Sequence, residues 1–234
     1  MKGRIKRPEA NKVRLILPRV GFIKIGMKTE RGLPQSVDYF IPVGKYAGLF
    51  TQAYGERPQT IQIVFPDDDP EKVCNERFEY RDDEGRLIAE GNGELFKVWD
   101  GTKYEELTVE QYPNLMQSIA KRYPNKAVKK GGDGWKITLT LNFIVPLVRG
   151  VAGVWQFTTN GSASTIPAIR ETFDGMLAER GFCKGIIFDL NVQFATTQKP
   201  GDKSRFPVVS LVPNESDDNV LKVKKAFEPN KRIE

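Results

Sequence analysis

The clearest alternation of hydrophobic and polar positions lies in WKITLTLNFIV, residues 135–145. Every second residue from Ile137 to Phe143 is apolar, and the residues between them are polar. A period of two residues is typical of a strand with one buried face. Comparable β-rich runs predict further strands in VRLIL (13–17), GFIKIG (21–26), VDYFIPV (37–43), TIQIVF (60–65), VAGVWQFTT (151–159), GIIFDLNVQFAT (185–196) and RFPVVSLVP (205–213).

The middle of the chain predicts hairpins. Phe78 and Tyr80 alternate with charged residues, Asp83-Glu84-Gly85 predicts a turn, and RLIAEG returns as the next strand. Asp100-Gly101 lies between LFKVW and TKYEEL, which predicts a two-residue turn because both central residues of a type I′ turn need positive φ.

Helical patterns are fewer than strands. KYAGLFTQAYG (45–55) ends at Gly55, and DDPEKV predicts a single helical turn. A helix is predicted within 108–124, where Thr108 and Gln111 fit a capping box and Pro113 favours a later start. SDDNVLKVKKAF predicts a short C-terminal helix after Ser216. The longest helix follows residue 164 and ends at Gly181, with an apolar stripe of Ile166, Ile169, Phe173, Met176 and Leu177.

These elements predict an α+β fold, a mostly antiparallel sheet built from hairpins with three or four helices. Regular βαβ alternation is absent, which excludes the doubly wound nucleotide-binding folds. We expect three segments: a basic N-terminal β segment (1–44), a main α+β domain (45–213), and a C-terminal helix with a basic tail (214–234).

Composition narrows the chemistry. The 234 residues include no histidine and only two cysteines, Cys74 and Cys183. His-based catalysis and imidazole metal sites are therefore excluded, and both thiols are expected to be reduced and structural. We expect no cofactor and no bound metal. No apolar run approaches the roughly 18 residues that span a membrane, so we expect a cytoplasmic protein without a membrane partner.

The net charge of +6 is unevenly placed. Residues 1–28 carry nine bases against Glu9 alone, and residues 121–136 carry six bases against Asp133. Residues 67–84, in contrast, hold nine acids against three bases. Clustered bases are typical of a surface for nucleic acid or for an acidic partner, and also of a plain solvated surface.

Three local patterns leave two interpretations each. NGSAST (160–165) lacks both phosphate-binding glycine motifs, which favours a capped strand-to-helix turn over a phosphate site. In that interpretation Ser164 or Thr165 caps the helix, and Trp155 and Phe157 before it are core residues. The triplet Asp67-Asp68-Asp69 fits a turn with a helix cap better than a metal site. The strand aromatics, which include Trp99, Trp135, Trp155, Phe96 and Tyr104, are core residues or base-stacking groups, and Trp135 is expected to be partly exposed.

The order of several segments carries a resemblance. They are YGERPQTIQIVFP (54–66), ERFEYRDDEGRLIAEGNG (76–93), LTLNFIVPLVRGVAGVWQFTTNGSAS (139–164) and IIFDLNVQF with RFPVVSLVP (186–213). Over roughly residues 45–213 the chain resembles the recombination directionality factor-like proteins of phages and mobile elements. The resemblance implies an accessory protein that acts with a large serine integrase and favours excision. Some relatives carry the label "hydrolase or metal-binding protein", but Ala89–Gly93, where a cysteine-based metal site is expected, contains no cysteine.

Two other functions stay open: a nucleic-acid-binding replication or repair factor of a phage or mobile element, and a carboxylate-metal hydrolase, which the lack of histidine disfavours. We expect no enzymatic activity and no catalytic residue. The expected partners are a large serine integrase or another recombination or replication protein, and DNA, bound directly or through that partner. The residues expected to make these contacts are Lys2, Arg4, Lys6, Arg7, Lys126, Lys129, Lys130 and Trp135.

Overall fold

The run with the clearest alternation forms β8 (Trp135–Phe143), a central strand of the larger of two sheets. The protein is described here by a computed structural model that covers residues 17–197 and 200–214. β4 (Cys74–Arg81) and β9 (Val154–Thr159) flank β8 on either side, both antiparallel to it. The predicted apolar face is confirmed, because Leu139, Leu141 and Phe143 are fully buried. On the polar face Lys136 is exposed, but Thr138 is buried where the Asn160 amide donates to its hydroxyl.

The larger sheet has eight strands in the order β2-β1-β9-β8-β4-β5-β6-β7. Its remaining strands are β1 (Arg19–Lys28), β2 (Pro34–Val43), β5 (Leu87–Gly91), β6 (Leu95–Trp99) and β7 (Tyr104–Thr108). The smaller sheet has the order β11-β10-β3, built from β3 (Thr60–Val64), β10 (Ile187–Thr196) and β11 (Arg205–Pro213). Among the strand ladders of the described residues only β1 and β9 pair in parallel, so the predicted antiparallel α+β fold is confirmed.

Five helices occur in the described residues. They are α1 (Ala47–Tyr54), α2 (Pro70–Val73), α3 (Leu115–Arg122), α4 (Lys126–Lys129) and α5 (Thr165–Arg180). α2 and α4 are single turns of four residues each. The helix predicted within 108–124 starts after Pro113, as the proline suggested. The predicted C-terminal helix and nearly all of VRLIL lie outside the described residues.

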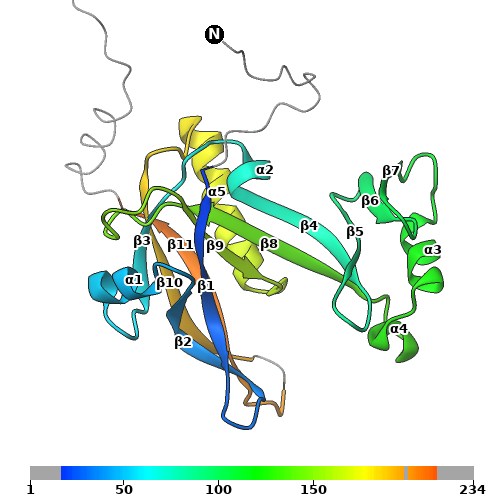
Figure 1. The fold of residues 1–234 in the computed structure, drawn as a ribbon, viewed down its shortest axis with the longest axis horizontal. Coiled ribbons are helices and arrows are strands. Elements are labelled where there is room, and N and C mark those ends of the chain that lie inside the picture. Colours follow the sequence, from blue (N-terminus) through cyan, green and yellow to red (C-terminus); the bar gives the residue numbers. More distant parts are fainter. Residues whose placement is uncertain (1–16, 198–199, 215–234) are drawn as a thin grey trace, which may run out of the picture.

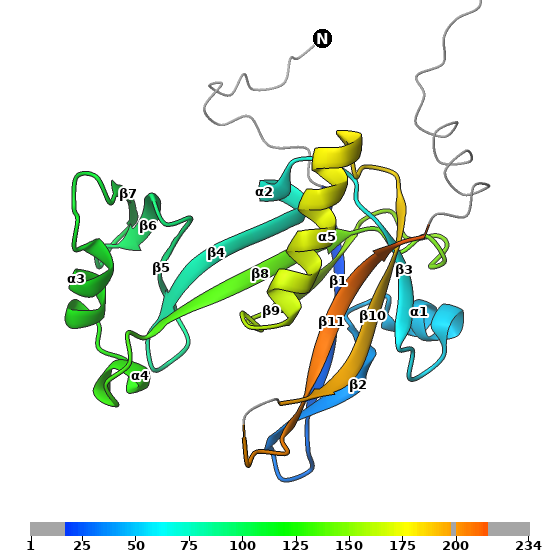
Figure 2. The ribbon, with the colours of Figure 1, turned by 180° about the vertical axis from the view of Figure 1, so that it is seen from behind.

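The main core lies between the two sheets and α5. Figure 2 shows α5 lying across β8 and β9, and its predicted stripe of Ile166, Ile169 and Phe173 is buried there. The Phe173 ring meets Phe65 edge-on at 5.0 Å between ring centroids. Trp155 and Phe157 are 1% and 0% exposed, so both are core residues as predicted.

Trp155 also restricts which residue can occupy one position of the neighbouring strand β1. A Cβ at Gly21 of β1 would lie only 2.4 Å from the Trp155 ring. Only glycine lets β1 approach β9 this closely, so the parallel pairing of these strands requires it. The proposed segment boundaries near residues 44 and 214 stay a prediction. The strands of the first proposed segment, β1 and β2, lie in the same sheet as β8 and β9 of the second.

A second core lies in a projecting lobe, residues 82–134, which we call the arm. The chain enters the arm from β4 and leaves it into β8, so the arm is one continuous insertion between two paired strands. Figure 1 shows β4 and β8 running out from the rest of the protein, the body, to carry β5–β7, α3 and α4. The arm's core contains Ile88, Phe96 and Ile119 together with Tyr80 at the end of β4, and it is a separate cluster from the core of the body.

Two local predictions were wrong in detail. The loop between β6 and β7 has four residues instead of two, because the Asp100 carboxylate accepts from the backbone N–H groups of Thr102 and Lys103. At the turn before α5, Ser164 occupies the N-cap position without a side-chain hydrogen bond. The Thr165 hydroxyl instead accepts from the Val209 N–H of β11 at 3.1 Å. NGSAST is therefore a strand-to-helix turn that also fastens α5 to the smaller sheet.

Candidate functional site

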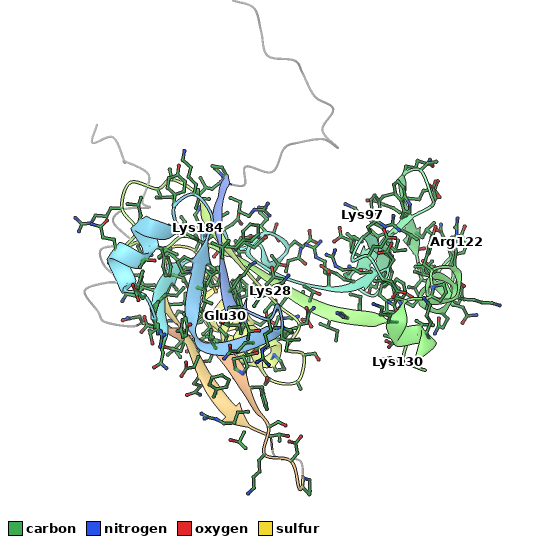
Figure 3. The ribbon with its side chains drawn as sticks, turned by 60° about the horizontal axis from the view of Figure 1, so that its bottom comes forward. Lys28, Glu30, Lys97, Arg122, Lys130 and Lys184 are labelled. Atoms are coloured by element: carbon green, nitrogen blue, oxygen red, sulfur yellow. The ribbon has the colours of Figure 1, made fainter. Side chains whose placement is uncertain are left out.

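The basic residues predicted from the 121–136 segment lie on the arm. Lys126 and Lys129 bound the single turn α4, Lys130 follows it, and the side chains of all three are exposed. Figure 3 shows Lys130 and Arg122 on the part of the arm that points away from the body. Lys2, Arg4, Lys6 and Arg7 lie outside the described residues, so the structure brings together only the second half of the predicted set.

Asn125 holds α4 in place. Its side-chain oxygen accepts from the Ala127 and Val128 N–H groups, both at 3.1 Å, and caps the helical turn. Its side-chain nitrogen donates to the Arg81 carbonyl at 2.8 Å and to the Gly134 carbonyl at 3.3 Å. Because Arg81 ends β4 and Gly134 precedes β8, one buried amide fixes the basic turn to the ribbon that carries the arm.

Asp83 offsets part of the positive charge of α4. Its carboxylate accepts from the Lys129 ammonium at 2.7 Å and from the Lys126 backbone N–H at 2.6 Å. The hydrogen bond from Lys129 lowers the pKa of Asp83. Lys121, Lys130 and Lys136 make no ion pair with any residue that the structure describes. The Lys126 ammonium makes no ion pair with a described residue either, so these four lysines carry unpaired positive charge in the 121–136 segment that the structure describes.

Trp135 is half-buried, in line with the expected partial exposure. Its ring packs on Tyr80 and Phe96, with centroids 5.2 and 5.4 Å away, and its indole N–H donates to the Met116 carbonyl at 3.2 Å. These contacts make it a part of the arm's core. It also lines a hollow of about 430 Å³ with Phe78, Met116, Asp133, Lys136, Ile137, Asn160 and Ser162.

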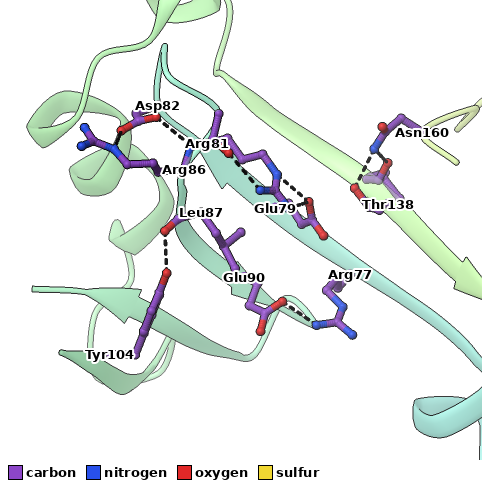
Figure 4. Close-up of polar contacts among 12 residues, drawn as sticks. Arg77, Glu79, Arg81, Asp82, Arg86, Leu87, Glu90, Tyr104, Thr138 and Asn160 are labelled. Carbon is purple, nitrogen blue, oxygen red and sulfur yellow. Dashed lines mark hydrogen bonds and ion pairs between the residues drawn. The ribbon is translucent and has the colours of Figure 1, made fainter. Parts of the chain in front are cut away.

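Several charges on β4, β5 and the turn between them are paired (Figure 4). Arg77 bonds to Glu90, Arg81 bonds to Glu79 at 3.0 Å, and Arg86 bonds to Asp82 at 2.7 Å. In Figure 4 the amide of Asn160, from the turn before α5, also reaches Thr138 on β8, 2.6 Å away. Paired charges of this kind give little field for a charged ligand.

The acidic triplet has structural roles. Asp67 accepts from the Lys72 ammonium at 2.8 Å, and this hydrogen bond lowers the pKa of Asp67. Asp68 accepts from the backbone N–H groups of Cys183 and Lys184, and Asp69 caps α2. Across 17–197 and 200–214, no three acidic or cysteine side chains converge as metal ligands would.

Both cysteines are free thiols in the body core, as predicted. Burial raises the pKa of Cys74 and of Cys183 to about 12. A thiol with this pKa is protonated at neutral pH and is a poor nucleophile, so these side chains act in packing.

One feature had no signal in the residue pattern. Trp99, Tyr104 and Tyr123 line a second hollow, of about 360 Å³, with Asp82, Arg86, Leu87 and Ile88. Trp99 and Tyr104 are cross-strand partners in a hairpin, a pairing that the four-residue loop sets and that the predicted two-residue turn did not give. Tyr123 follows α3, and only the packing of α3 on the hairpins brings it to the same place.

The geometry defines a two-lobed α+β protein in which an inserted arm, with its own core, carries exposed lysines at and after α4. The model of the Gp3-like family, described as recombination directionality factor-like, matches residues 20–214. The chain therefore belongs to the recombination directionality factor-like family. No curated protein and no solved structure matched the chain. None of the helices within the described ranges is long and apolar enough to cross a membrane.

Proposed function

We propose that this chain is a non-enzymatic accessory protein of DNA recombination in a phage or other mobile element. In this proposal it binds a large serine integrase on DNA and favours excision over integration. Membership of the recombination directionality factor-like family over residues 20–214 is the observation that carries the proposal. The role needs a binding surface and no reactive residue, because a partner shifts an equilibrium only by preferring one of its states.

The two-lobed architecture supports such a role. The body and the arm have separate cores, so each lobe presents a surface of its own to a protein–DNA complex. We propose that Lys126, Lys129, Lys130 and Trp135 of the arm contact DNA or a DNA-bound partner. The same contact is proposed for Lys2, Arg4, Lys6 and Arg7 from sequence alone.

The direct test is recombination with the integrase of the same element. The purified chain should raise the yield of excision between the two junction sites of an integrated element and lower the yield of integration. Unchanged yields in both directions would remove the integrase from the proposal. The chain alone should cleave no DNA.

The DNA contact is tested separately. Replacing Lys126, Lys129 and Lys130 together with alanine should weaken DNA association and flatten its salt dependence in proportion to the number of phosphates that these lysines neutralise. A matched control replaces three exposed lysines outside the arm: Lys24, Lys28 and Lys45. If the arm variant binds DNA as the unmodified chain does at low salt, α4 makes no DNA contact.

The second candidate is a nucleic-acid-binding replication or repair factor, and the unpaired Lys121, Lys130 and Lys136 favour it. Steeply salt-dependent DNA binding without any effect on the integrase would support it over the accessory role. A carboxylate-metal hydrolase would instead show magnesium- or manganese-dependent turnover that Asp67→Asn or Asp69→Asn abolishes. We expect no such turnover, since Asp67 and Asp69 bind Lys72 and cap α2.

A further inference from the structure

The outer edge of β7 differs from the other sheet edges of the described residues. At the edge of β2, the Phe40 N–H donates to the Pro58 carbonyl at 2.8 Å. At the edge of β3, Val64 exchanges two backbone bonds with Ile144, and at the edge of β11 the Val209 N–H donates to Thr165. These three edges are therefore partly covered by neighbouring segments.

β7 has no such cover. Two backbone hydrogen bonds lie at the ends of the β6–β7 hairpin: Asp100 N–H donates to the Lys103 carbonyl, and Val109 N–H donates to the Glu94 carbonyl. They set which residues of β7 direct their backbone groups toward β6. By the alternation of an antiparallel ladder, Glu105 and Leu107 direct their N–H and C=O groups to β6, whereas Tyr104 and Glu106 direct theirs outward. No described residue bonds to those outward groups, and residues 104–106 are exposed.

Acidic side chains outnumber basic ones on and beside this edge, where the bases are Lys103 and Lys97, the cross-strand partner of Glu106. Glu105 and Glu106 lie on β7, Glu94 precedes β6, and Glu110 follows β7. Glu105 pairs with Lys103 at 3.2 Å, while Glu106 makes no ion pair with any residue in the described ranges. A negative edge repels the phosphates of nucleic acid. A second copy paired antiparallel through Glu106 would set like charges opposite each other, which is also unfavourable.

An aromatic hollow lies on the face of the same hairpins, where the Tyr104 hydroxyl reaches across β6 to donate to the Leu87 carbonyl of β5 at 2.6 Å. Tyr104 belongs to β7 and also lines the 360 Å³ hollow with Trp99 and Tyr123. Tyr104 is 47% exposed, and its ring packs against Trp99 at 5.3 Å. Half-exposed tyrosine and tryptophan rings around a concavity are typical of the anchor sites at which protein partners insert an apolar side chain.

We propose that the edge of β7 binds an extended, basic segment of a partner protein, which adds a strand to the large sheet. The outward backbone groups of Tyr104 and Glu106 supply the hydrogen bonds. Lysine or arginine side chains of the segment pair with Glu106 and its acidic neighbours, and one apolar side chain on the same face packs on the exposed ring of Tyr104. This surface is separate from the exposed lysines at and after α4, and the proposal holds whether or not the partner is an integrase.

The test uses the full chain and a blocked peptide in which a valine and a lysine stand two residues apart, so that both face the Tyr104 and Glu106 side of the sheet, and binding is followed by NMR. The amide signals of residues 104–108 should shift, and the Tyr104 and Glu106 amides should become protected from hydrogen exchange. Glu106→Pro removes an outward N–H without touching the bonds to β6, so it should weaken peptide binding about tenfold or more. Glu56→Lys, on the exposed surface of the body, is the control for net charge and should bind normally.

Four outcomes would overturn the proposal. In the first, a peptide with glutamate in place of lysine binds as tightly as the lysine peptide. In the second, a peptide N-methylated on alternate backbone nitrogens binds as tightly as the unmethylated one. In the third, no amide signal of residues 104–108 responds to the peptide. Self-association of the chain that Glu106→Pro abolishes would also overturn it, because the edge would then serve a second copy. Unchanged melting temperatures of the variants show that the edge, and not folding, is being measured.

Discussion

The hydroxyl of Tyr80 lies 2.8 Å from the carbonyl oxygen of Tyr123, to which it donates a hydrogen bond. Tyr80 stands near the end of β4, and Tyr123 follows α3, so this contact joins the ribbon from the body to the helical part of the arm. Tyr80 is fully buried, and its ring packs on Trp135. One side chain thus contributes both the hydrogen bond and the packing that hold the arm on its ribbon.

Tyr80→Phe should loosen the arm and leave the body intact. Loss of the hydroxyl leaves the Tyr123 carbonyl without this donor and costs about 1–2 kcal/mol. Native-state hydrogen exchange should show faster exchange in β5–β7 and α3, with unchanged protection in β9 and β10. Equal loss of protection in both lobes would mean that the two cores unfold as one unit.

Trp155→Ala should destabilise the body strongly. The side chain is 1% exposed, and its ring contacts Phe50 at 5.4 Å between centroids, so its removal costs about 3–5 kcal/mol. Thermal unfolding measures the loss. A variant with unchanged melting temperature that fails to bind DNA or a partner would show that Trp155 belongs to a recognition surface.

Thr165→Val and Ser164→Ala should separate two roles at the turn before α5. The Thr165 hydroxyl is buried and accepts from Val209 N–H, so its loss leaves a strand donor unpaired and costs about 1–3 kcal/mol. Ser164 makes no capping bond, so its replacement should change stability by less than about 0.5 kcal/mol. Chemical denaturation of both variants measures the difference, and the opposite order would contradict the assignment.

Replacement of the arm should leave a folded body. Arg81 and Gly134 are the next residues along the paired ends of β4 and β8, so Asn-Gly in place of residues 82–133 should close a two-residue hairpin. The same variant carries Tyr80→Thr and Trp135→Thr, because removal of the arm would expose these two aromatic side chains to solvent. We expect cooperative unfolding and the methyl NMR signals of a packed core. A molten product would show that the body depends on the arm.

The carboxyl group of Asp100 should titrate near pH 2. Backbone hydrogen bonds from Lys103 and Thr102 lower its pKa from 3.8 to about 2. A lowered pKa in the folded state stabilises the β6–β7 loop above pH 3.8, and this contribution disappears as the pH falls through 2. An NMR titration of the Asp100 carboxyl carbon measures it, and a midpoint at the ordinary value would show that the loop bonds are absent in solution.

The sequence predicted the elements better than their assembly. The alternation in 135–143 and the stripe of α5 are local patterns, and both identified the buried face correctly. The arm was not predicted, because its definition depends on the register between Tyr80 and Trp135, which are far apart in the chain. Asp68 accepting from the Cys183 N–H is a comparable case, since no spacing signals a contact across 115 residues.

The interpretation of the basic segment changed for the same reason. Charge density alone could not show that Asp83, from the turn between β4 and β5, pairs with Lys129. It also could not show that the Trp135 indole N–H donates to the Met116 carbonyl. The aromatic hollow around Tyr104 and the open edge of β7 had no sequence signal, because both arise from how α3 and the hairpins pack.

The position of the arm between β4 and β8 has a consequence for the order of events during synthesis. Every residue of the arm's core, from Phe78 to Trp135, has been translated before β9 exists, so this core needs no strand from later in the chain. The body's sheets, in contrast, need β1 to find β9 and β3 to find β10 across a long intervening chain. On the ribosome the arm is therefore the first part able to fold, and it emerges as a finished lobe while the strands on either side of it still await their partners.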